Sequence, residues 1–70
     1  MTEAEKKAAA IEQAAVALLS EAKAAGVDLT EIAAKARTGI IGNAMYTWVS
    51  DHGMKAEAGN AVDYLIGAVK

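Results

Sequence analysis

The spacing of apolar residues near the start of the chain predicts a long helix over residues 3–25. The apolar positions recur every three or four residues, which places them on one side of an α-helix. Thr2 and Glu5 have the spacing of a capping box, and Gly26 is suited to the left-handed residue that ends a helix. The expected stripe consists of Ala4, Ala8, Ile11, Ala15, Leu18, Leu19 and Ala22.

A second helix is expected to begin at residue 29. Asp28 is a good N-cap, Glu31 stands at the capping-box position, and Val27 and Ile32 have the spacing of a hydrophobic staple. The apolar residues that follow keep the helical period as far as residue 40. They are Leu29, Ile32, Ala33, Ala36 and Ile40.

Beyond residue 40 the apolar face changes direction, by roughly 100°, or one residue of helical turn. The earlier stripe would continue onto polar residues, whereas the apolar set moves to Ile41, Ala44, Met45, Trp48 and Val49. Either a continuous helix is buried on two faces, or the chain kinks or breaks near Gly39. Gly39 and Gly42 together disfavour a helix by about 2 kcal/mol relative to alanine, so we favour the break, with helices over 29–38 and 40–52.

A last helix is expected over residues 55–69, because Gly53 is suited to end the preceding one. The fold class is therefore all-α: a small bundle of three helices with the middle one kinked or broken near Gly39, or of four helices. Residues 1–70 form a single helical domain, since a chain of this length holds one domain at most.

The composition limits how such a bundle is stabilised. Eighteen of the 70 residues are alanine and none is phenylalanine, so the helices bury little area per residue. Chains this short usually need disulfides, a structural metal, association or very good packing. With no cysteine and one histidine, the sequence offers no disulfide and no common zinc-ligand set, and we expect no metal and no cofactor.

Catalysis is not expected, and neither is a membrane span. Asp51 and His52 are adjacent, which on a helix points them about 100° apart, and we interpret His52 as a residue of the last turn before Gly53. No apolar run approaches the roughly 20 residues that a membrane-spanning helix needs. The sequence thus predicts a soluble, non-enzymatic protein.

One stretch resembles the helix-turn-helix of small repressors and transposase-type DNA-binding modules. Glu31-Ile32-Ala33, a glycine-containing break and Tyr46-Thr47-Trp48-Val49 carry the resemblance, which covers residues 28–53. It implies a DNA-binding protein in which Arg37, Asn43 and Thr47 contact the duplex. Nucleic acid is the less favoured partner, because phosphate contacts need basic side chains and the second half of this stretch has none.

Protein association is the favoured function. Tryptophan, tyrosine and methionine are enriched at the centres of interfaces, and the stretch after residue 40 has all three. Its candidate partner-binding residues are Ile41, Met45, Tyr46, Trp48 and Val49, and the alternative is that the first and last helices cover them. We expect an interaction or structural protein that binds another protein or itself, cytoplasmic or virion-associated by analogy with short phage assembly factors.

Overall fold

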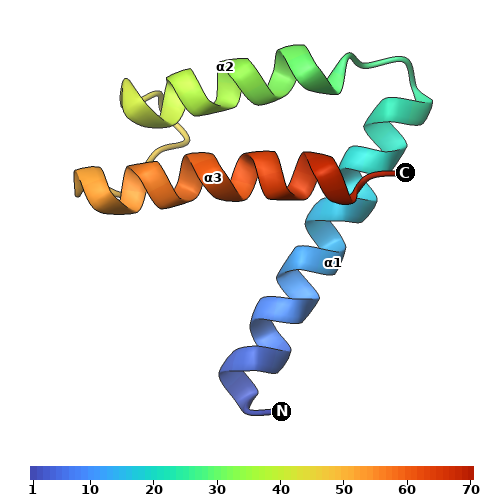
Figure 1. Ribbon diagram of the computed structural model, residues 1–70, viewed down its shortest axis with the longest axis horizontal. Coiled ribbons are helices and arrows are strands. Elements are labelled where there is room, and N and C mark those ends of the chain that lie inside the picture. Colours follow the sequence, from blue (N-terminus) through green and yellow to red (C-terminus); the bar gives the residue numbers. More distant parts are fainter.

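The computed structural model describes all 70 residues, which form three α-helices and no strand. The helices are α1 (Glu3–Ala24), α2 (Leu29–Ile41) and α3 (His52–Ala68). The predicted all-α, three-helix class is confirmed. The helices α2 and α3 lie side by side and run in opposite directions, whereas α1 crosses them at an angle and its N-terminal half extends away (Figure 1).

The ends of α1 form as the sequence predicts. The Thr2 hydroxyl accepts a hydrogen bond from the Glu5 N–H (3.1 Å), and the Glu5 carboxylate accepts one from the Thr2 N–H (3.2 Å). Gly26 has a φ of 95°, and the Val27 N–H donates to the Ala22 carbonyl (3.0 Å). This is the left-handed glycine ending that the sequence indicates.

The start of α2 is predicted only in part. The Asp28 carboxylate accepts a hydrogen bond from the Glu31 N–H (3.2 Å), so the N-cap is confirmed. The reciprocal half of the capping box does not form, because the Glu31 carboxylate instead pairs with Lys35 one turn later (3.1 Å).

The predicted boundary between helices 29–38 and 40–52 is wrong. The helix α2 continues through Gly39 to Ile41, and residues 42–51 form a loop instead of a helix. The chain turns at Asn43, whose φ of 59° is left-handed, and the Ala44 N–H donates to the Gly39 carbonyl (2.8 Å). Asparagine is one of the few residue types that adopt this conformation readily. The break therefore lies close to Gly39, but Asn43 makes it.

The last helix begins three residues earlier than predicted. Asp51 is its N-cap and accepts a hydrogen bond from the Met54 N–H (3.2 Å). Gly53 consequently lies in the first turn of α3 and does not end a helix. His52 stands at the N-terminal end, where the helix dipole is positive, and the expectation of a last-turn position is wrong.

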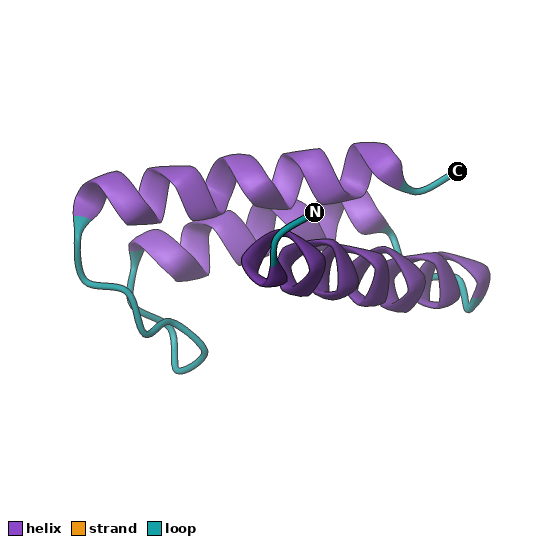
Figure 2. Cartoon of the chain, turned by 90° about the horizontal axis from the view of Figure 1, so that it is seen from below, coloured by secondary structure: helices purple, strands orange, loops and turns teal.

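The core is small and lies mainly between α2 and α3. Only Ala33 and Lys55 are buried, each with 5% of its surface exposed. The contribution of α1 comes from its second half, because residues 1–14 are all exposed. Viewed from below, the three helices form a thin layer, and the 42–51 loop projects from it at the end away from the C-terminus (Figure 2).

Candidate protein-binding surface

The five predicted partner-binding residues lie at the end of α2 and in the loop that follows it. We call Ile41, Met45, Tyr46, Trp48 and Val49 the loop cluster. Trp48 is 91% exposed and Met45 is fully exposed, Ile41 and Tyr46 are also exposed, and Val49 is half-buried. The alternative that the first and last helices cover these residues does not hold for this chain on its own. The prediction that they share a helix is wrong, because most of them are in the loop.

Hydrogen bonds fold the loop back onto the last turns of α2. The Thr47 hydroxyl donates to the Gly39 carbonyl (3.2 Å), and the Tyr46 hydroxyl donates to the Lys35 carbonyl (3.5 Å). Gly39 allows the ring of Tyr46 to approach, since a Cβ there would lie 2.6 Å from the Tyr46 Cζ. The close contact at Gly39 is thus made by an aromatic ring.

A buried lysine ties α3 to the turn at the end of α2. The Lys55 Nζ donates to the Asn43 Oδ1 (2.7 Å), and Lys55 is 5% exposed. An ammonium group this well covered needs a hydrogen-bond acceptor, and Asn43 supplies it. Neither residue is expected from the sequence to have this structural role, although a glycine-asparagine pair after an apolar helix is a recognisable signal that a helix ends.

A hollow of about 340 Å³ lies beside the loop cluster. Its lining contains no acidic, basic or histidine side chain, and Thr47 is its one residue that is neither aliphatic nor aromatic. Such a hollow suits an apolar side chain of a protein partner better than a charged ligand. The lining residues are Ile40, Tyr46, Thr47, Trp48, Val49 and Ala58.

The three residues assigned to DNA in the alternative hypothesis all have partners within the chain. The Arg37 Nε pairs with the Asp63 carboxylate (3.4 Å), Asn43 accepts from Lys55, and Thr47 donates to the Gly39 carbonyl. The helix-turn-helix arrangement does not form either, because Tyr46-Thr47-Trp48-Val49 lies in the loop.

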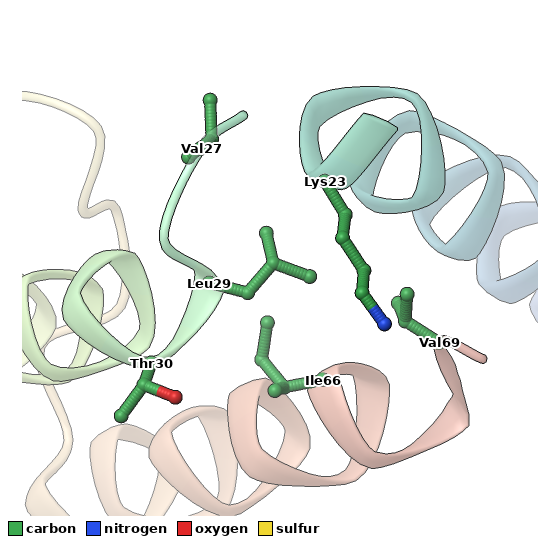
Figure 3. Close-up of a pocket in the computed structure, with 6 residues that line it drawn as sticks. All are labelled: Lys23, Val27, Leu29, Thr30, Ile66 and Val69. Atoms are coloured by element: carbon green, nitrogen blue, oxygen red, sulfur yellow. The ribbon is translucent and has the colours of Figure 1, made fainter. Parts of the chain in front are cut away.

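A second hollow, of about 270 Å³, lies where α1, α2 and the end of α3 meet (Figure 3). The side chains of Leu29 and Ile66 point toward one another across it, and Lys23 reaches in from α1. One lysine beside apolar side chains and Thr30 is not an arrangement for acid-base or nucleophilic chemistry. No group of three or more His, Cys, Asp or Glu side chains is placed to hold a metal ion.

Comparison of the chain with protein-family models, curated proteins and solved structures finds no match. Among the three helices, none combines the length and the apolar character required to cross a membrane.

Proposed function

We propose that this is a small non-enzymatic interaction or structural protein, which binds another protein or further copies of itself through the loop cluster. The observation that carries the proposal is the exposure of Trp48, at 91%, together with that of Met45, which lies in the same loop and is fully exposed. Contiguous exposed apolar side chains are typical of interaction sites.

The chemistry of the loop cluster suits a binding hot spot. Tryptophan and tyrosine are enriched among the residues that contribute most to binding, and fully burying one large apolar side chain contributes about 1.5–3 kcal/mol. The hydrogen bonds of Tyr46 and Thr47 to α2 restrict the loop before a partner arrives. A restricted loop loses less conformational entropy on binding, which favours affinity.

The polar groups around the cluster have structural roles, which supports binding over catalysis. Asp51 caps α3, and Lys55 and Asn43 hold the turn after α2. Each of these groups is already engaged within the chain, and none is aimed into the hollow beside Trp48.

Affinity capture with matched baits tests the proposal. The baits are the wild-type chain, Trp48→Ala, and Val27→Ala, which shortens an apolar side chain in the turn between α1 and α2, at the far end of the molecule (Figure 1). A specific partner is retained by the wild type and by Val27→Ala but not by Trp48→Ala. Once purified, that partner shifts the Trp48 emission to shorter wavelength in a titration.

Two results together would contradict the proposal. The first is that no protein distinguishes the Trp48→Ala bait from the wild type. The second is that acrylamide quenches Trp48 equally well in dilute and concentrated solutions of the chain, so that no copy covers it either.

A further inference from the structure

The chain exposes more surface than a compact protein of its mass. Its accessible surface is 5270 Å², whereas the scaling for folded monomers gives about 4,100 Å². Its Cα radius of gyration is 12.8 Å, against about 11 Å expected for this length. The molecule measures 34 × 33 × 18 Å, so the helices form an open slab instead of a closed bundle.

Part of the excess lies in a groove between α1 and the pair formed by α2 and α3. This interhelix groove has a volume of about 280 Å³ and only apolar residues line it. Leu18 on its rim is 73% exposed, although its position in the apolar stripe of α1 is that of a core residue. The lining residues are Ala15, Leu18, Leu19, Ile32, Ala33, Ala36, Val62, Leu65 and Ile66.

We infer that a second copy of this chain covers the interhelix groove, so that two chains form a homodimer with a shared core. The surface excess of about 1,100 Å² per chain is comparable to the area that one subunit of a stable dimer buries, about 800 Å² or more. The inference goes beyond the proposed function, because the interhelix groove does not include the loop cluster, which lies at the other end of the α2–α3 pair (Figure 1).

The size of the core favours a second copy over a different protein. Ala33 is the one buried apolar residue, and no disulfide supplements it. A core this small leaves the fold dependent on whatever covers the groove. If the fold depends on the protein that covers the groove, that protein must be present whenever the chain is made. A second copy of the same chain always meets that condition.

The apolar stripe of α1 supports the same occupant. Its members are spaced alternately by four and three residues, the pattern of a helix that packs against another helix along its length. Residues 1–14 of α1 are all exposed, although Glu12 accepts a hydrogen bond from Tyr64 of α3. The first half of α1 therefore leaves most of this face uncovered within the chain. The residues with this spacing are Ala4, Ala8, Ile11, Ala15, Leu18 and Ala22.

Thiol reactivity tests whether the groove is covered. The chain has no cysteine, so Leu18→Cys introduces a single thiol on the groove rim, and Gln13→Cys provides the control on the exposed opposite face of α1. In a monomer position 18 is exposed, so the thiols at positions 13 and 18 should react with a thiol reagent at similar rates. Where about nine chains in ten are dimeric, we expect the thiol at position 18 to react roughly tenfold more slowly, and dilution to remove the difference.

Sedimentation equilibrium on the wild type gives the second measurement, with twice the chain mass expected at high concentration. Equal reactivity at positions 13 and 18 at every concentration would overturn the inference, as would a wild type that remains monomeric. If Trp48→Ala dissociates the dimer while the thiol at position 18 stays fully reactive, the copies meet at the loop cluster. In that case the groove inference fails and the proposed function stands.

Discussion

At the scale of single residues, Gly39 and Asn43 determine how the loop cluster is held. Gly39 leaves room for the Tyr46 ring, and its carbonyl accepts hydrogen bonds from the Thr47 hydroxyl and the Ala44 N–H. Asn43 adopts the left-handed turn and accepts the hydrogen bond of Lys55. Both residues therefore position the loop through contacts within the chain and not through contacts with a partner.

Replacing Gly39 by alanine is expected to destabilise the fold slightly, by a few tenths of a kcal/mol. Alanine favours the helix by about 1 kcal/mol, but its Cβ displaces the Tyr46 ring and the hydrogen bond to Lys35 with it. In a Tyr46→Ala background nothing is displaced, and Gly39→Ala should stabilise. Urea unfolding of the four chains at one protein concentration measures both changes. Equal effects in the two backgrounds would show that Tyr46 does not restrict position 39.

Substitutions at Asn43 are expected to rank asparagine above glycine and glycine above alanine in stability. Glycine adopts the φ of 59° without strain but leaves the Lys55 ammonium without its acceptor, which costs about 1–3 kcal/mol. Alanine loses the acceptor and adds about 1–2 kcal/mol of left-handed strain. The same urea titration measures the ranking. If glycine is more stable than asparagine, the Lys55 hydrogen bond contributes little.

At the scale of helices, one polar contact links α1 to α3 across the widening angle between them. The Tyr64 hydroxyl donates to the Glu12 carboxylate (3.0 Å). This hydrogen bond, and then the negative charge of Glu12, raise the pKa of Tyr64 above its ordinary value. The contact stabilises the fold while Tyr64 is protonated, so its contribution is present below about pH 10 and is lost as the pH rises through the raised pKa.

Tyr64→Phe should therefore lower the urea midpoint slightly at pH 8, and the difference from the wild type should be lost as the pH rises through the raised pKa of Tyr64. The effect is small because both side chains are exposed. Comparing the two chains at each pH cancels the effect of pH on the rest of the protein. A difference that persists unchanged to the highest pH would mean that the ring packs but the hydroxyl does not contribute.

The sequence predicts those elements whose signals are local. Thr2 with Glu5, Gly26 and Asp28 each act on backbone groups within a few residues, and these caps form, although Glu31 does not complete the capping box of α2. The stretch after residue 40 was assigned to a helix because its apolar residues keep a helical period. Those residues belong mostly to a loop. The contacts that fix this loop join Lys55 to Asn43 and Thr47 to Gly39, which are separated by 12 and 8 positions along the chain.

The five candidate binding residues could be named from their types, but their exposure could not. Whether Trp48 is buried depends on where α1 and α3 pass, and the stripe of α1 does not specify its crossing angle. The groove rim at Leu18 was missed for the same reason. An apolar position in a helical stripe predicts burial, and only the arrangement of the helices shows that α1 leaves it exposed.

At the scale of the whole molecule, the interhelix groove and the loop cluster both remain exposed, and the core holds one buried apolar residue. In the inferred dimer, association is a condition of the fold, because a second copy covers the interhelix groove and leaves the loop cluster for further binding. For such a dimer, folding and association are a single equilibrium, and stability depends on protein concentration.

The most direct test is urea unfolding of the wild-type chain, followed by far-UV circular dichroism over a range of protein concentrations. A roughly hundredfold increase in concentration is expected to raise the apparent stability by about 2.7 kcal/mol per dimer, with a corresponding rise in the urea midpoint. A chain that unfolds cooperatively at the same urea concentration throughout that range would be a stable monomer, and would contradict the account.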